Sequence, residues 1–390
     1  MKESGISNKV TEAWALEDLY VKVNSTELCE IDIVGYEAIY GGCNVPAELQ
    51  FIDSRGLTTG DTDNSADIGI GGNVEIGFTT PTGCDFKETY VIKQVLTTNN
   101  SKNQKLVTLK LEDLESRNLK GSFVSKGYPE KEFSKATEEH LNELNKDVQK
   151  TTKKELVVVP PKKEQKINMV IPTNIDFYTF LNKEMKDKGF TYIKDKTKNY
   201  LVHAENKEFD KLKSEGDVYE FDTHAFSLTR IVQFNVEGFD MDGYLASIPT
   251  SVNSIDLVTN NSKDSKDGTD TKISKKDSEG ATKSKISGQD PGKVAKQTVR
   301  GSKQGQKTAK DQQYFETLSN LQKMSIWVPG RVDNMVGRKI QVILPKPSYY
   351  ANTGNDDLFS GEWEVYGTRD KVIGMYFMQE LYIRRPGGSK

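Results

Sequence analysis

The sequence has few of the residues that build disulfide, metal and redox sites. Its three cysteines are an odd number and include no CxxC spacing, so neither a disulfide framework nor a zinc site is expected. Cys29, Cys43 and Cys84 are best explained as buried free thiols. The three histidines are scattered singly and indicate no triad or metal cluster. We therefore expect no cofactor, no metal and no catalytic residues.

Long apolar runs are also missing. No stretch approaches the ~18 residues that a membrane-spanning helix needs, and Met1–Lys9 contains no apolar segment of the secretory type. We therefore expect synthesis in the cytoplasm and no membrane anchor.

The chain is long but has little apolar material. At 390 residues and 43.8 kDa it should form two or three domains. Only 35% of its residues are hydrophobic and its mean hydropathy is -0.64, which is low for a free-standing enzyme. Charged residues make up 28% of the chain but nearly cancel, at a net charge of -3. The whole chain thus lacks the basic balance of a nucleic-acid-binding protein.

Residues 1–120 are predicted to form a first β-barrel domain. Short apolar-rich segments lie between residues 18 and 52, and a polar loop follows at Asp53–Ala66. Further segments are rich in β-branched residues with near alternation, which is typical of antiparallel strands. These segments are Asp67–Thr79, Thr89–Thr98 and Leu106–Leu114.

Residues 121–224 change pattern and predict an α+β middle domain. Pro129–Lys150 is charged, with apolar residues spaced for a short amphipathic helix. Asn174 is a suitable N-cap for a helix over Ile175–Lys188, and Gly189 is a suitable end for it. A hairpin is then predicted from Phe190–Ile193 and Tyr200–His203.

A second β-barrel domain, residues 225–252 and 311–390, is split by a long insert. Residues 253–310 are dominated by Ser, Lys, Asp, Gly and Thr and cannot bury enough apolar surface to fold alone. The segments of this domain are a helix at Asp311–Lys323 and strands within Ala225–Met241, Met324–Leu344 and Gly361–Arg385. The predicted fold is therefore mainly β with an α+β insertion, and consists of two tube-like antiparallel β-barrel domains.

Three groups of residues resemble chemical sites but lack the necessary context. The glycines between residues 69 and 77 have no following Lys-Ser/Thr and no following helix, so they indicate turns or strands rather than a phosphate loop. Asp61–Asp67 alternates like a calcium loop but lacks the EF-hand glycine and closing glutamate, which favours a solvated loop. Glu362 and Glu364 share one strand face without a partner carboxylate, so a structural or interface role is favoured over glycoside chemistry.

The insert carries the strongest electrostatic signal. Residues 261–310 contain thirteen Lys/Arg and six Asp/Glu, and residues 291–310 contain six basic residues and no acidic one. This tract has no interleaved aromatic residues, so base stacking is not indicated. A solvated or interface-ordered linker is favoured over a contact with nucleic acid.

Short motifs across nearly the whole chain resemble one protein family. Ile39-Tyr40-Gly41 and the run Leu49–Arg55, LQFIDSR, are similar to the opening strands of the baseplate hub proteins of T4-like contractile-tailed bacteriophages. Val328–Leu344, VPGRVDNMVGRKIQVIL, and the closing run Gly361–Pro386 resemble the last strands of that family. The insert and the middle domain do not match in detail, so contacts there cannot be transferred.

The resemblance implies a structural protein without enzyme activity. Two tube-like barrels per chain would let a homotrimer form a pseudo-sixfold ring between the sixfold tail tube and the threefold central spike. The implied partners are the tail tube protein, the spike protein and other baseplate proteins, with transient contact to DNA or the tape measure protein during genome ejection. The implied location is the virion tail baseplate, after synthesis in the host cytoplasm.

Two alternative functions stay open. The related barrels of VgrG-type spikes suggest a component of a contractile injection or type VI-like secretion particle. A cell-wall-degrading baseplate enzyme would need paired carboxylates or a Cys/His constellation, and the sequence proposes none. Interface residues are expected among exposed aromatics and arginines, although Trp327 and Trp363 fit a core position equally well. The candidates are Trp327, Arg338, Trp363, Tyr366 and Arg384.

Overall fold

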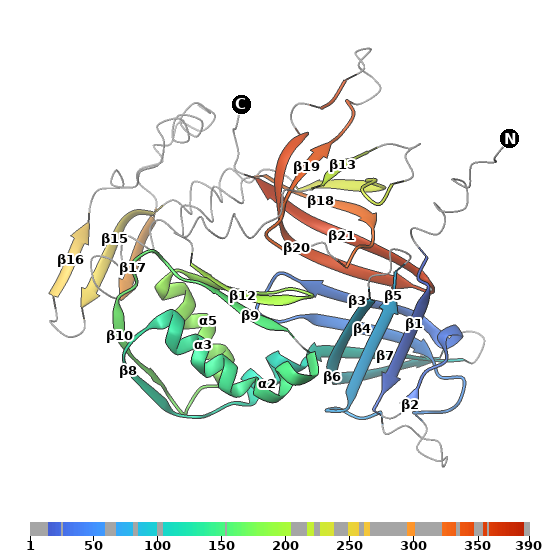
Figure 1. The fold of residues 1–390 in the computed structure, drawn as a ribbon, viewed down its shortest axis with the longest axis horizontal. Coiled ribbons are helices and arrows are strands. Elements are labelled where there is room, and N and C mark those ends of the chain that lie inside the picture. Colours follow the sequence, from blue (N-terminus) through green and yellow to red (C-terminus); the bar gives the residue numbers. More distant parts are fainter. Residues whose placement is uncertain are drawn as a thin grey trace.

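Strand pairing organises most of the described residues, and thirteen of the strands they form belong to one sheet. The mainly β architecture with an α+β insertion agrees with the prediction (Figure 1). Among the described residues, no helix has the length and apolar character needed to cross a membrane. The computed structural model describes residues 15–24, 26–58, 68–80, 85–99, 104–152, 154–203, 217–221, 227–237, 249–256, 261–265, 295–300, 322–332, 336–346, 354–356 and 359–385.

The first barrel consists of strands that bury every second side chain. In β4, Ala47, Leu49 and Phe51 face the core while their neighbours face outward, because successive side chains of a strand point to opposite faces. Leu49 and Phe51 are fully buried, as are Ile76 and Leu109 on neighbouring strands. In the order of their pairing, its strands are β3 (Ile33–Tyr40), β4 (Pro46–Ile52), β7 (Lys105–Asp113), β6 (Asp85–Asn99), β5 (Asn73–Thr79), β1 (Asp18–Val23) and the short β2 (Thr26–Glu27), and the 3-10 helix η1 (Glu30–Asp32) precedes β3.

The second barrel surrounds its own core, which includes Trp363, Tyr219 and Ile231. Its ring of strands closes where β13 meets the segment before β14: Glu220 N donates to Thr229 O at 3.1 Å and Ile231 N donates to Glu220 O at 2.9 Å. Its strands are β13 (Val218–Glu220), β19 (Lys339–Ile343), β20 (Gly361–Ile373), β21 (Tyr376–Arg385), β18 (Gln322–Pro329) and β14 (Gln233–Glu237).

The hairpin β20–β21 belongs to both barrels. The first part of β20 pairs with β19, and its last part, Thr368–Ile373, pairs with β3. The tip of the hairpin completes the first barrel, since Leu16 N donates to Met375 O at 2.7 Å and Phe377 packs against Phe78. The strand order β14-β18-β21-β20-β3-β4-β7-β6 is therefore continuous across the two barrels, and every neighbouring pair in it is antiparallel.

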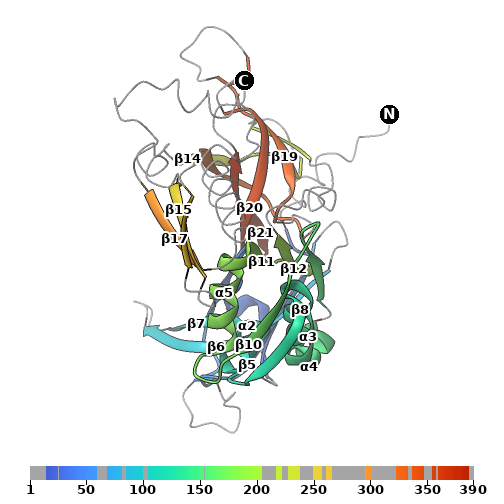
Figure 2. The ribbon, with the colours of Figure 1, turned by 90° about the vertical axis from the view of Figure 1, so that its left-hand side faces the viewer.

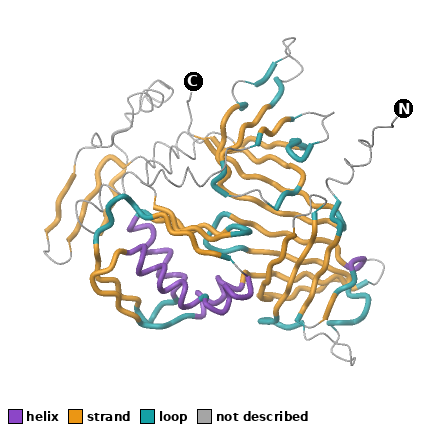
Figure 3. Tube along the Cα trace, viewed as in Figure 1, coloured by secondary structure: helices purple, strands orange, loops and turns teal. Residues whose placement is uncertain are grey.

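The middle domain packs its helices between two small sheets (Figure 3). The long helix α5 ends at Gly189 as predicted, in a left-handed conformation with φ 78°. The expected N-cap Asn174 is wrong: Asp176 caps the helix, because its Oδ1 accepts a hydrogen bond from Thr179 N at 2.9 Å. The elements are α2 (Leu114–Gly121), β8 (Lys126–Glu132), α3 (Phe133–Leu144), α4 (Lys146–Thr152), β9 (Glu155–Val159), β10 (Lys166–Ile171), α5 (Phe177–Lys188), β11 (Phe190–Lys194) and β12 (Lys198–His203).

The insert contains strands that its composition did not predict. The strand β15 (Pro249–Asp256) pairs antiparallel with β16 (Asn261–Ser265) and parallel with β17 (Ala295–Arg300). Backbone hydrogen bonds connect these strands, and such bonds do not require an apolar pattern. The predicted helix Asp311–Lys323 lies outside the described residues as far as residue 321, and its last two residues already belong to β18.

Candidate functional site

The turn Gly41-Gly42, which follows β3, is the point where three parts of the fold meet. Gly41 N donates to Lys194 O at 3.2 Å, and Lys194 N donates to Gly42 O at 3.0 Å, so the turn holds the end of β11. On its other side Gly41 lies against β20: with φ 117°, a Cβ atom here would come 2.6 Å from Tyr366 O. Only glycine fits this position without strain. The motif Ile39-Tyr40-Gly41, which carries part of the family resemblance, therefore ends at a junction between both barrels and the middle domain.

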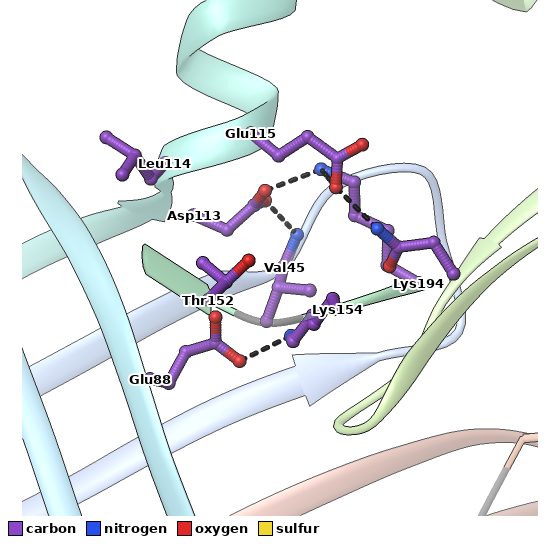
Figure 4. A pocket seen from close by; sticks show the side chains of 9 residues that line it. Val45, Glu88, Asp113, Leu114, Glu115, Thr152, Lys154 and Lys194 are labelled. Atoms are coloured by element: carbon purple, nitrogen blue, oxygen red, sulfur yellow. Dashed lines mark hydrogen bonds and ion pairs between the residues drawn. The ribbon is translucent and has the colours of Figure 1, made fainter. Parts of the chain in front are cut away.

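Lys194 joins the middle domain to the first barrel through a buried ion pair (Figure 4). Its Nζ lies 2.5 Å from Asp113 Oδ1 and donates to Ser116 Oγ at 2.8 Å, and its side chain is 2% exposed. Asp113 also accepts from Val45 N and Ser116 N, both at 2.8 Å, and thereby caps α2. Burial alone would raise the pKa of Asp113, but the Lys194 charge and these hydrogen bonds together hold it below its usual value.

Glu115 is a second carboxylate that lies beside Lys194. Its carboxylate accepts hydrogen bonds from Tyr192 Oη at 2.5 Å, from Asn199 Nδ2 at 2.6 Å and from Asn145 Nδ2 at 2.7 Å. It also lies 3.4 Å from Lys194 Nζ. Burial favours the neutral form of Lys194, but Asp113 and Glu115 together raise its pKa above the usual value. The junction therefore keeps this lysine charged although it is buried.

A further buried pair, Lys154 with Glu88, lies across a small cavity from Lys194 (Figure 4). Desolvation raises the pKa of Glu88, although Lys154 acts in the opposite direction. The cavity has a volume of about 10 Å³, which is room for one water molecule. This space is too small for a substrate or an organic cofactor, and the charged residues around it come from both the first barrel and the middle domain.

The turn between β11 and β12 inserts two more charged residues. Lys196 Nζ lies 2.9 Å from Asp370 Oδ2 on β20, and Gln379 Nε2 donates to Asp370 Oδ1 at 2.6 Å. Asp195 beside it is fully buried, and the charge and the backbone N–H of Lys196 are the groups that favour its ionised form. Burial raises the pKa of Asp195 to about 6 against the opposing effect of Lys196. Desolvation likewise raises the pKa of Asp370.

Three of the five candidate interface residues lie on the outer face of the second barrel. Trp327 is half-buried on β18, and the Arg384 guanidinium lies 5.7 Å from the centre of the Tyr366 ring. Trp363 is 1% exposed and is a core residue, and its Nε1 donates to Phe359 O at 3.0 Å. Arg338 Nη2 lies 3.4 Å from Asp217. Their roles as interface residues stay predictions.

The described part of the chain contains no group of three or more His, Cys, Asp or Glu residues arranged to hold a metal ion. The aspartate-rich loop Asp61–Asp67 lies outside the described residues. Glu362 and Glu364 take part in separate ion pairs, with Lys339 at 3.0 Å and Arg384 at 3.5 Å.

The expectation of buried cysteines is wrong for Cys29. Its thiol is free and exposed, because it lies just before η1, which buries none of its own residues. Cys43 is a half-buried free thiol that donates to Asn182 Oδ1 at 3.0 Å. Cys84 lies outside the described residues.

Sequence reasoning missed the junction residues Asp113, Glu115, Lys194 and Asp195. The available signal was the charged run Lys194–Lys198, KDKTK, in a hairpin turn. Such a run is usually a solvated surface turn, and only its docking against the barrel buries it.

Comparisons with known proteins agree on the fold. The tail protein from Neisseria meningitidis MC58 has a TM-score of 0.59 at 13% identity, over 96% of this chain and 97% of that chain. The 43 kDa tail protein of prophage MuSo2 from Shewanella oneidensis has a TM-score of 0.58 at 8% identity, over 95% and 98%. The E. coli c3393 protein has a TM-score of 0.52 at 10% identity, over 95% and 77%. It is described as a type VI secretion component with structural similarity to the T4 tail proteins gp27 and gp5.

No family model matches the sequence, and no curated protein matches it. The likeness to tail proteins is therefore carried by the structure: the Neisseria and Shewanella tail proteins align with the chain over nearly its whole length. The chain has the fold of phage tail proteins and of this type VI secretion component.

Proposed function

We propose that this protein is the structural hub of a contractile phage tail baseplate. Three copies form a ring that joins the sixfold tail tube to the threefold central spike and lets DNA pass on ejection. The observation that carries the proposal is the continuous antiparallel sheet that extends through two barrels of one chain. Three such chains present six barrels, which matches threefold symmetry on one side and sixfold symmetry on the other.

The junction supports a mechanical role. The buried pairs of Lys194 with Asp113 and of Lys196 with Asp370 join the middle domain to the first barrel and to the shared hairpin. Buried, hydrogen-bonded ion pairs fix one relative position, because breaking one of them leaves an uncompensated charge inside the protein. A hub that transmits force between tube and spike requires such fixed geometry.

The test is the assembly state together with partner binding. Light scattering or analytical ultracentrifugation should give a trimer of about 131 kDa, three times 43.8 kDa. The trimer should bind the tail tube protein on one side and the spike protein on the other, and it should be found in purified virion baseplates. A chain that stays monomeric at high concentration and binds neither partner contradicts the proposal.

A contractile injection or type VI-like particle is the second candidate, because the E. coli neighbour is a secretion component. Mass spectrometry of particles from the source cell separates the two: phage capsid proteins accompany a tail hub, and secreted effectors accompany a secretion spike. A third candidate is a cell-wall-degrading baseplate enzyme. Peptidoglycan turnover that disappears when one carboxylate is substituted would favour it over a purely structural role.

Whether the basic tract of the insert contacts DNA or another tail protein is a question separate from ring formation. Deletion of residues 261–310 tests whether it contacts DNA or the tape measure protein. Unchanged particle assembly and DNA delivery would dismiss that role without affecting the ring.

A further inference from the structure

The small cavity at the junction is lined mainly by groups that form hydrogen bonds. Of its nine lining residues only Val45 and Leu114 are apolar. The first barrel contributes Glu88 from β6, and the middle domain contributes Lys194 and Asn199 from the hairpin β11–β12. In two perpendicular views this hairpin lies between the helices of the middle domain and β20 (Figure 1 and Figure 2). The cavity is therefore a polar space between two domains, and its volume of about 10 Å³ matches one water molecule.

The side-chain carbonyl of Asn199 is a buried acceptor at this cavity. Asn199 is 5% exposed, and no described residue donates a hydrogen bond to its Oδ1. The other end of the amide is fixed, because Nδ2 donates to Glu115 Oε2 at 2.6 Å and a carboxylate can only accept. Turning the amide over would place two acceptor oxygens against each other. The carbonyl oxygen thus needs a donor, and in native proteins an ordered water commonly supplies one.

Lys154 brings hydrogen-bond donors to the same cavity. An ammonium group carries three N–H donors. Among the described residues, Glu88 Oε2 is the acceptor that Lys154 Nζ bonds, and the lysine side chain is only 10% exposed. A molecule in the cavity can therefore accept a hydrogen bond from Lys154 and donate one to Asn199 Oδ1.

The charges around the cavity favour a neutral occupant. Lys154 already holds Glu88, and Lys194 already holds Asp113. A cation would compete with these two lysines for their carboxylates, and an anion would compete with the carboxylates for the lysines. A neutral molecule that both donates and accepts, and that fits about 10 Å³, is water.

We propose that one ordered water occupies this cavity and bridges the middle domain to the first barrel. It accepts a hydrogen bond from Lys154 Nζ and donates its two protons to Asn199 Oδ1 and to the carboxylate of Glu88. Three hydrogen bonds are typical of a buried water. Because Asn199 also bonds Glu115, which lies beside Lys194, the water joins the two buried ion pairs into one network. This inference does not depend on ring formation.

A crystal structure of the full wild-type chain, at a resolution that shows ordered solvent, tests the site directly. We expect a density peak within hydrogen-bonding distance of Lys154 Nζ, Asn199 Oδ1 and the Glu88 carboxylate. A structure without this peak overturns the proposal. A peak whose density and ligand distances fit a metal ion overturns the assignment of water.

Coupling between Lys154 and Asn199 gives a readout in solution. The two side chains have separate partners, Glu88 and Glu115, and the asparagine carries no charge. Their substitutions should therefore act independently unless something bridges them. Urea unfolding of Lys154→Met, Asn199→Leu and the double variant measures this. With the water in place, the two single losses in the unfolding equilibrium constant should multiply to about threefold or more above the loss in the double variant.

Two controls assign that coupling to the cavity. Val45→Ile adds a methyl group at the wall of the cavity, and in this background the coupling between Lys154 and Asn199 should fall to about onefold. Lys87→Met removes an exposed lysine from the opposite face of β6, and it should show no coupling to Asn199→Leu. Circular dichroism checks that every variant folds. A coupling of about onefold in the wild-type background, or equal coupling in the Val45→Ile background, overturns the water bridge.

Discussion

The substitution Asp195→Asn should stabilise the protein at pH 8 and have no such effect at pH 4. Asp195 is fully buried, and this burial outweighs the charge and the backbone N–H of Lys196, so that its pKa is raised to about 6 from the usual 3.8. Lys196, Lys154 and Asp370 are the charged groups that act on it, and Tyr200 lies within its electrostatic reach. The carboxylate is therefore ionised at neutral pH in a place that disfavours its charge.

The direction in which the contribution of Asp195 to stability changes with pH follows from proton binding. Because the pKa of Asp195 is higher in the folded chain than in the unfolded chain, the folded chain binds this proton more tightly. The contribution of Asp195 to stability is therefore present at low pH and is lost as the pH rises through about 6. A pKa difference between 3.8 and about 6 corresponds to about 3 kcal/mol at pH 8. The asparagine amide needs partners of its own, so we expect a net gain of about 1–3 kcal/mol.

The assay is urea unfolding of the wild type and the variant at several pH values between 4 and 8. The free energy of unfolding should differ most at pH 8, and the difference should disappear toward pH 4. Glu88 also has a raised pKa, but it is present in both proteins and is not among the groups that act on Asp195; Asp370 does act on Asp195, so its response to the substitution is part of the measured difference. The control is Glu155→Gln, whose side chain is 68% exposed and pairs with Lys198 on the surface; it should change stability by less than about 0.5 kcal/mol. A wild-type-to-variant difference that is constant across this pH range would refute the reasoning.

Three further substitutions test other parts of the structure by urea or thermal unfolding. Lys194→Met should lower the free energy of unfolding by about 3–5 kcal/mol, because it leaves Asp113 buried without its partner. The control Lys198→Met, at a half-exposed lysine in the same turn, should lower it by less than about 1 kcal/mol. Equal losses in the two variants would contradict the role of the junction. Gly41→Ala should lower the free energy of unfolding by about 1–3 kcal/mol, since its φ of 117° and the nearby Tyr366 carbonyl oxygen exclude a Cβ atom. An unchanged stability would show that the contact with β20 is not tight. Asp176→Ala should cost about 1 kcal/mol through loss of the α5 cap, and Asp176→Ser should recover most of that loss.

Much of the local structure follows directly from the sequence. Tyr36, Ala38 and Tyr40 alternate inward along β3, and this period of two identifies a half-buried strand without any knowledge of its partners. The helix α5 and its end at Gly189 could also be predicted, because the spacing of apolar residues and the presence of a residue that tolerates positive φ are local properties of the sequence. The one error at this helix, Asn174 in place of Asp176, is a two-residue shift between side chains that cap equally well.

The sequence by itself determined barrel strands such as β3 and β4, the helix α5 and the presence of two β segments around an insert, because each of these depends on residues close together in the chain. It did not indicate β8, β10 or the strands of the insert. Only the tertiary structure decided that one hairpin serves both barrels, since the partners of β20 are β19 and β3, and β3 lies more than 300 residues away. The same holds for the junction. Lys194 and Asp195 lie in a charged turn that would be solvated in isolation, and they become buried only because Gly41-Gly42, Asp113 and Asp370 converge on them from distant strands. Burial of charge is a property of the assembled fold, so no local pattern could have indicated it.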